Sequence, residues 1–367
     1  MKILWFTWKD LKNPLAGGAE VVNEEIAKRL AENGHEVILL TAGFAGSKQQ
    51  EEINGYKVIR VGSRWSIYWH AYKYYKKNLK GWADCIIEEI NTIPFFTSFY
   101  TKEKKILLFY QLCREIWFHQ MFFPLSLFGY LIEPIYLRLL RKHRVMTISE
   151  SSRKDLARHG FKPKNIKIFP IGITLEPIEN ERIVKKYPTF TALSLGAIRP
   201  MKGTADQIKA FELAKEDLPE LKLKIAGGGS GKYYDKVMKL ISKSKYSADI
   251  EYLGKVSDSE KINLMKKSHL ILVTSIKEGW GLIVTEANSQ GTPAIVYNVD
   301  GLRDSVINKT TGIVVGENTP AYLAKAIRSL IKDKTKYKKF QSNALAYSKK
   351  LNYDNSYKKF IDIVEVS

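Results

Sequence analysis

Short apolar runs rich in β-branched residues alternate with amphipathic segments along the whole chain. The runs in the first half are KILWFTW, HEVILLTA, YKVIRV, DCIIEE, KILLFYQ, RVMTIS and IKIFPIGI; those in the second half are FTALSLGAI, LKLKIAG, IEYLG, LILVTS, AIVYN, DSVIN and GIVV. Runs of this kind are typical of parallel strands buried on both faces. The intervening segments, such as 203–216 and 258–267, have helical length, so the pattern predicts an α/β fold.

A polar, proline-marked stretch, TLEPIENERIVKKYPT, interrupts this alternation at 174–189. With 367 residues the chain exceeds the size at which one core stops growing, so two domains are expected. We expect an N-terminal domain at 1–173, a linker at 174–189, a C-terminal domain at 190–350 and a C-terminal helix at 351–367. Residues 320–366 have the composition of basic amphipathic helices.

The segment KEGWGLIVTEANSQGTPAI places Glu278 and Glu286 eight positions apart around a Gly-Trp-Gly turn. It lies between two predicted parallel strands, so the turn falls at a strand's carboxyl end, next to a helix N-terminus. Anionic ligands bind at such places. A carboxylate on a short helix packed against a sheet is costly to bury, so we expect both acids to face ligand hydroxyl groups. The alternative is that Glu278 caps a turn and Glu286 lies on a solvated helix face.

The composition favours a folded protein of a reducing compartment. Hydrophobic residues make up 45% of the chain, which argues against disorder. The two cysteines, Cys85 and Cys113, lack metal-ligand spacing and suit a reducing compartment. We see neither a signal peptide nor an apolar run of ~18 residues, so a cytoplasmic protein is expected.

The net charge of +21 indicates a phosphate-rich partner: nucleic acid, an anionic membrane surface or a nucleotide-linked substrate. The charge is spread over both halves, whereas nucleic-acid binders concentrate it on one element. Two stretches, 65–82 and 117–144, combine aromatic residues with Lys and Arg, which is the composition of an interfacial membrane contact. The alternative for each is a core helix with a solvated basic end.

The βαβ start of the chain lacks a GxGxxG fingerprint, so a dinucleotide site is not indicated. Instead, GGAE, TISESSRKDL, FPIGI, LSLGAIRPMKG, LKLKIAGGGS, YLGKVSDSEK and EGWGLIVTEANSQGTPAI occur in this order. This set resembles the GT4 family of retaining glycosyltransferases. The resemblance implies the GT-B fold: two Rossmann-like domains that face each other across a cleft, with the C-terminal helices packing back on the N-terminal domain.

The resemblance also implies roles for individual residues. Arg199 and Lys202 would neutralise the departing diphosphate in place of a metal, so no cofactor is expected. Glu278 would contact hydroxyls of the transferred sugar, and Glu286 the ribose hydroxyls. The remaining donor-site residues would be the amides of Trp280, Gly281 and Leu282, the close-approach glycines Gly17, Gly18, Gly227 and Gly228, and Val256, whose main chain would hold the base. For the glycines, simple turn formation is the alternative.

The chain departs from many relatives near the reacting carbon. Where they carry a histidine, this sequence has Tyr110 and Gln111. Glu115 lies in the same predicted loop, so Tyr110 or Glu115 is a candidate contact for the acceptor. Front-face retaining transfer does not require the histidine.

The resulting expectation is a metal-independent retaining enzyme that moves sugar from a UDP- or GDP-sugar to a glycan or lipid-linked acceptor. Its place would be the cytoplasm, with peripheral attachment to the inner face of the cell membrane, and it would not bind nucleic acid. Two alternatives stay open: a nucleotide-sugar epimerase of the same fold, and a basic protein that coats nucleic acid or membrane.

Overall fold

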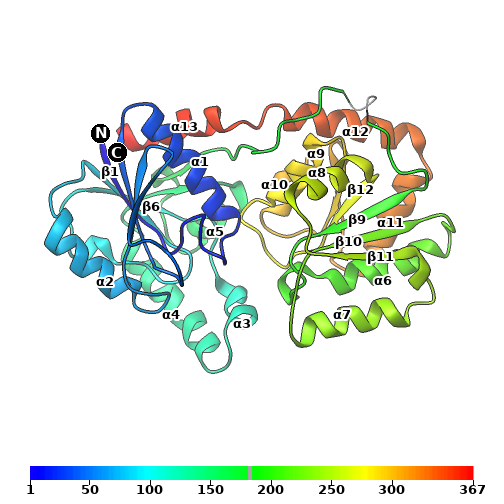
Figure 1. The fold of residues 1–367 in the computed structure, drawn as a ribbon, viewed down its shortest axis with the longest axis horizontal. Helices are drawn as coiled ribbons and strands as arrows, with labels where there is room; N and C mark the ends of the chain where they lie inside the picture. Colours follow the sequence, from blue (N-terminus) through cyan, green and yellow to red (C-terminus); the bar gives the residue numbers. More distant parts are fainter. Residues whose placement is uncertain (181–183, 367) are drawn as a thin grey trace. The chain divides into compact units, whose positions relative to one another are not determined.

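The computed structural model describes residues 1–180 and 184–366, and they form two compact units (Figure 1). Unit 1 comprises Met1–Gly172 and Asn352–Ser367, and unit 2 comprises Ile173–Leu351. The stretch expected as a linker is counted with unit 2, and its residues 181–183 lie outside the described part.

Unit 1 is built on an eight-stranded sheet with the order β3-β4-β2-β1-β5-β6-β7-β8. All neighbouring strands are parallel except β3 and β4. The strand order changes direction between β1 and β5, which is the topological switch point where open α/β sheets bind ligands. The strands are β1 (Lys2–Phe6), β2 (Glu36–Thr41), β3 (Gln50–Ile53), β4 (Tyr56–Arg60), β5 (Cys85–Glu89), β6 (Lys104–Leu108), β7 (Arg144–Thr147) and β8 (Ile166–Ile168).

Helices cover this sheet, and the last helix of the chain is one of them. In α13 the buried Phe360 stacks on Trp5 of β1, with ring centroids 5.5 Å apart. The α-helices of unit 1 are α1 (Gly18–Glu32), α2 (Ile67–Tyr74), α3 (Trp117–Gln120), α4 (Leu125–Leu140), α5 (Glu150–Arg158) and α13 (Tyr353–Glu365). A π-helix at Tyr75–Leu79 continues α2, and 3-10 turns occur at Thr97–Phe99, Arg114–Ile116 and Pro163–Asn165.

Unit 2 contains a six-stranded parallel sheet with the order β11-β10-β9-β12-β13-β14. This is the doubly wound order, and its switch point lies between β9 and β12. The strands are β9 (Thr191–Leu195), β10 (Lys222–Ala226), β11 (Ile250–Gly254), β12 (Leu270–Val273), β13 (Ala294–Val296) and β14 (Gly312–Val314).

The helices of unit 2 follow these strands. They are α6 (Thr204–Lys215), α7 (Lys232–Lys243), α8 (Asp258–Lys267), α9 (Leu282–Ser289), α10 (Leu302–Ser305), α11 (Pro320–Ile331) and α12 (Lys334–Ser348), with 3-10 turns at Pro200–Lys202 and Ser247–Asp249. The strand predicted at DSVIN, 304–308, is wrong. Its first two residues end α10, and Asn308 makes only an isolated bridge with Gly312.

A partly buried lysine binds the segment before β9 to the rest of unit 2. The Lys186 ammonium donates to the carbonyl oxygens of Ser268 and Gly291 at 2.8 and 3.0 Å and to the Thr292 hydroxyl at 2.8 Å. These acceptors follow the last turns of α8 and α9, where free carbonyls attract a cation. Lys186 therefore ties this segment to two helix ends within unit 2.

Candidate functional site

Two loops meet at the switch point of unit 2, one after β9 and one after β12. The Thr274 hydroxyl lies 3.0 Å from the carbonyl oxygens of both Lys202 and Gly203, and the Ile276 amide donates to Met201 at 3.0 Å. Gly203 is left-handed, with φ +66°, and a Cβ there would lie 2.5 Å from the Thr274 carbonyl oxygen. Only glycine allows the backbones of the two loops to lie this close together.

Lys202 and Glu278 are brought together by these loops. The Lys202 ammonium lies 2.5 Å from Glu278 Oε1, and the Ser275 hydroxyl donates to the same oxygen at 2.6 Å. Both charged side chains are partly exposed. The site thus presents a cation, a carboxylate and a hydroxyl at the carboxyl edge of the sheet, where the sequence placed the first two.

Helix α9 begins beside this group. Its N-cap, Gly281, is left-handed, with φ +88°, and a Cβ there would lie 2.8 Å from the Leu302 side chain. The first amides of the helix are therefore free of a side-chain cap and can hold an anion. The neighbouring Trp280 has a buried indole N–H without a hydrogen-bond partner in the described part of the chain. A buried donor of this kind needs an acceptor, and a ligand oxygen would supply one.

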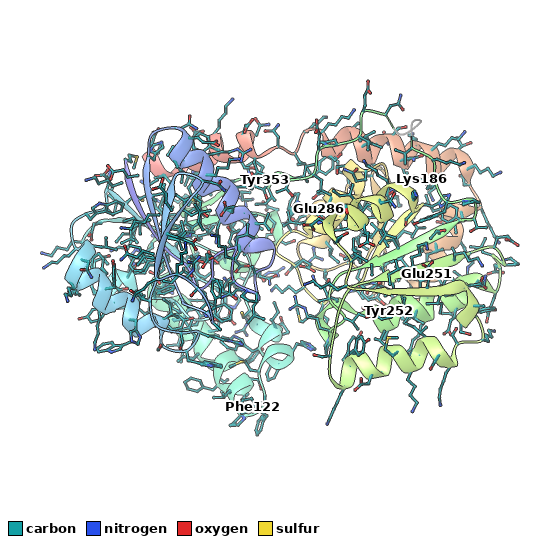
Figure 2. The ribbon with its side chains drawn as sticks, in the orientation of Figure 1. Phe122, Lys186, Glu251, Tyr252, Glu286 and Tyr353 are labelled. Carbon is teal, nitrogen blue, oxygen red and sulfur yellow. The ribbon has the colours of Figure 1, made fainter. Side chains whose placement is uncertain are left out.

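Glu286 lies on α9, labelled in Figure 2, where 14% of its side chain is exposed. Its carboxylate pairs with Lys261 of α8 at 3.2 Å. Burial raises the pKa of Glu286, while Lys261 acts in the opposite direction. The sequence did not predict this partner, because Lys261 is one of several lysines on a helix with no motif around it.

The other predicted donor-site residues surround this group within unit 2. Gly227 has φ +153°, and a Cβ there would lie 1.9 Å from the Gly196 carbonyl oxygen, so the loops after β10 and β9 touch. Gly228 accepts a hydrogen bond from the Ile198 amide at 2.8 Å. Val256 packs against the core beside β12, and Arg199 is exposed, with no ionic partner among the described residues.

The predicted residues of unit 1 lie at the carboxyl edge of its own sheet. Gly17 is the N-cap of α1, Gly18 is its first residue, and the Gly17 amide donates to Glu20 at 2.6 Å. Tyr110 follows β6 and is buried, and its hydroxyl donates to Asn23 at 2.6 Å. Glu115 is exposed on the 3-10 turn Arg114–Ile116.

Tyr110 belongs to a buried polar cluster that the sequence did not reveal. Glu89, the last residue of β5, accepts hydrogen bonds from the amide groups of Asn23 and Asn91, both at 2.6 Å. Burial, reinforced by the Glu20 carboxylate, raises the pKa of Glu89 to about 7. The available signal was the pair Glu88-Glu89 ending an apolar strand, since two acids there need partners at the sheet edge.

The chemistry available in unit 2 suits a phosphorylated polyol. Lys202, Arg199 and the α9 amides can hold negative charge, while Glu278 and Glu286 can accept hydrogen bonds from hydroxyl groups. The combination matches a diphosphate with a hydroxyl-bearing ring on each side.

Comparison with known proteins identifies the family of the chain. Residues 16–177 match the family model described as Glycosyltransferase Family 4, and residues 177–346 match Glycosyl transferases group 1. A poly(glycerol-phosphate) alpha-glucosyltransferase of Bacillus subtilis is 32% identical over 45% of this chain and 24% of its own length. An uncharacterised glycosyltransferase of Methanocaldococcus jannaschii is 23% identical over 100% of this chain and 98% of its own.

Among solved structures, Anabaena HepE in complex with UDP and glucose superposes with a TM-score of 0.75 at 18% identity, over 100% of both chains. This likeness shows the GT-B fold. The matched stretch covers 50% or less of the first several curated relatives. On the two family models and the fold together, the chain belongs to the group 1 glycosyltransferases of the GT4 type.

Proposed function

We propose that the protein transfers a sugar, with retention of configuration, from a UDP- or GDP-sugar to a glycan or lipid-carried acceptor. The observation that carries the proposal is the pairing of Lys202 with Glu278 at the switch point of unit 2, with Glu286 on the adjoining helix. Anabaena HepE, which shares the fold, was crystallised with UDP and glucose, and this supports a nucleotide-diphosphate donor.

In the proposed reaction the bond between the sugar's C1 and the diphosphate oxygen breaks, and a bond between C1 and an acceptor oxygen forms on the same face. The acceptor's proton passes to the leaving diphosphate. Lys202 and Arg199 stabilise the charge that develops there, so no metal is needed. Glu278 orients the transferred sugar, and Glu286 holds the two ribose hydroxyls.

The acceptor side of the proposal rests on the segment α3–α4. The inner face of α4 carries small or polar residues such as Ser126, Gly129 and Glu133, and Glu133 accepts from the amides of Cys113 and Arg114 and from the Trp117 indole. Tyr136, Leu137 and Leu140 are also buried, whereas most of the other large apolar side chains are exposed. The exposed ones in this segment are Phe118, Phe122, Phe123, Leu125, Leu127, Phe128, Leu131, Ile135 and Leu139.

Figure 2 labels Phe122 at the tip of this segment, away from the sheet of unit 1. An exposed apolar face of this size marks a membrane or protein contact. Arg138, Arg141 and Lys142 are exposed at its end, so an anionic bilayer is the occupant that complements both the rings and the charge. No helix in the described ranges is long and apolar enough to cross a membrane. We therefore place the enzyme on an anionic membrane surface.

A panel of UDP- and GDP-sugars, incubated with the protein in EDTA, tests the donor and metal parts of the proposal. We expect one donor to be hydrolysed slowly, and an NMR time course with acceptor to show an α-linked product from an α-linked donor. A β-linked product contradicts retention. Activity abolished by EDTA and restored by manganese contradicts metal independence, and an epimer formed without acceptor supports an epimerase instead.

A further inference from the structure

A small hollow in unit 1 is lined mainly by aromatic side chains and has a volume of 70 Å³. Its lining includes residues that follow four strands of the sheet: Trp8 after β1, Arg64 and Trp65 after β4, Thr92 after β5 and Trp117 after β6. We call it the aromatic hollow. It lies at the carboxyl edge of the sheet, at the β1/β5 switch point, where this fold class binds ligands. A hollow of this volume is too small for a whole nucleotide, so a ligand ring would rest largely on the exposed indole at its edge.

The entrance of the aromatic hollow holds a preformed stack. The Arg64 guanidinium lies between two indoles, 5.1 Å from the ring centroid of Trp8 and 5.0 Å from that of Trp65. The Trp8 indole N–H donates to the Arg64 carbonyl oxygen at 3.3 Å, which fixes the backbone beneath the stack. Arg64 pairs with no carboxylate among the described residues, unlike Lys9 on the same indole, which pairs with Glu20.

The exposed Trp65 and Arg64 side chains are suited to bind a ligand. Trp65 is 69% exposed, and a large indole left in water at a sheet's ligand edge is a surface for another ring. The Arg64 guanidinium has no hydrogen-bond partner among the described residues, and a guanidinium binds phosphate through two parallel hydrogen bonds. A flat apolar face beside an unpaired, oriented cation matches a sugar ring with a phosphate next to it.

We propose that the aromatic hollow binds a glycosyl phosphate as the reacting end of the acceptor, with the ring on Trp65 and the phosphate on Arg64. This rests on the proposed function, since it assigns the acceptor side of the same reaction. The hollow adjoins the segment α3–α4, which we propose contacts the membrane: Trp117 and Met121 line it, while Phe118 and Phe122 beside them are exposed. A glycosyl phosphate could therefore arrive as a lipid headgroup or free in solution.

Tryptophan fluorescence titration tests this, with saturating UDP present to occupy unit 2. Three probes are used. Glucose 1-phosphate carries both the ring and the phosphate, methyl glucoside carries the ring alone, and glycerol phosphate carries the phosphate alone. We expect glucose 1-phosphate to bind at least about tenfold more tightly than either half. Trp65→Ala and Arg64→Gln should each weaken it about five- to tenfold. Trp69→Ala is the matched control, because Trp69 is 57% exposed on α2 but does not line the hollow, and it should change nothing.

A second arm distinguishes the two sources. Vesicles containing a dodecyl glucosyl phosphate should retain wild-type protein more strongly than plain vesicles of equal charge if the headgroup is the ligand, and Trp65→Ala should remove this gain. Equal retention on both vesicles, with glucose 1-phosphate still bound, assigns the site to free sugar phosphates.

The proposal is overturned if Trp65→Ala binds glucose 1-phosphate like the wild type, if glycerol phosphate alone binds equally well, or if uridine monophosphate displaces the probe. Binding of UDP and GDP, measured on the same samples, distinguishes failure of this proposal from failure of the proposed function. Normal binding of UDP or GDP without a glucose 1-phosphate signal refutes the assignment of the aromatic hollow alone, whereas failure of the wild type to bind either nucleotide refutes the proposed function.

Discussion

In unit 1, the ionisation of Glu89 depends strongly on its surroundings. It is buried, faces Glu20 of α1 and Lys9 of the β1–α1 loop, and has its pKa raised to about 7. The folded protein therefore holds a proton on Glu89 where the unfolded chain has released it. Between the unfolded value, about 4.5, and pH 7 the free energy of unfolding should fall as pH rises, by up to about 3 kcal/mol from this group.

We predict that Glu89→Gln makes the free energy of unfolding depend less steeply on pH between 5 and 7. Urea unfolding at several pH values measures the slope, which is independent of any constant cost of replacing the carboxylate. The same slope in wild type and variant would show that Glu89 is ionised in the folded state throughout this range.

Some contacts between individual residues could be predicted from the sequence, and others could not. Lys202 and Glu278 could be placed on one sheet edge because both follow strands that neighbour each other, and the structure shows them in contact. The contacts of Lys261, Asn23 and Glu89 could not be predicted, because they depend on which face of each helix packs against which strand ends. The roles of Lys202 and Glu278 in catalysis stay predictions.

At the scale of elements, the sequence left two interpretations of α4 open. Its apolar run is equally compatible with a core helix, but Glu133 and Gly129 occupy the inner face, where Gly129 packs so closely on Trp117 that a Cβ would lie 2.4 Å from the ring. Strand β3 was missed for the opposite reason: QEEI has almost no apolar pattern and forms only as the antiparallel edge of β4.

The exposed face of α3–α4 predicts binding to anionic lipid. In liposome flotation the wild type should bind vesicles with phosphatidylglycerol and release them as salt is raised. Phe122→Asp with Phe123→Asp, and separately Arg141→Glu with Lys142→Glu, should each reduce binding at least about tenfold.

Two controls accompany the flotation. Phe99→Asp changes an aromatic side chain that is 66% exposed but lies outside this face. Lys338→Glu with Lys339→Glu reverses two positive charges in unit 2, as the Arg141 and Lys142 changes do in unit 1. Both control variants should bind vesicles like the wild type. If the wild type ignores anionic vesicles at low salt but forms dimers that Phe122→Asp disrupts, the face is a contact between copies of the chain.

At the scale of the whole molecule, the chain crosses from unit 2 back to unit 1 to complete it. Phe360 of α13 is fully buried between Trp5 and Phe169 of unit 1. Phe360→Ala should cost about 3 to 5 kcal/mol of stability and lower hydrogen-exchange protection in β1 more than in β9. Phe211→Ala, at a fully buried position of unit 2, should give the reverse pattern. Equal loss of protection in both units after either change would mean that they unfold as one.

The central claim is that the edge of unit 2 binds a nucleotide-diphosphate sugar through Lys202 and Glu286, and calorimetric titration with UDP and GDP in EDTA tests it most directly. We predict that one nucleotide binds the wild type, and that Lys202→Ala and Glu286→Ala each weaken it about ten- to a hundredfold. Lys209→Ala, an exposed lysine on the adjoining α6, should bind normally. Binding by Lys202→Ala and Glu286→Ala with wild-type affinity, or no binding of either nucleotide by the wild type, would contradict the claim.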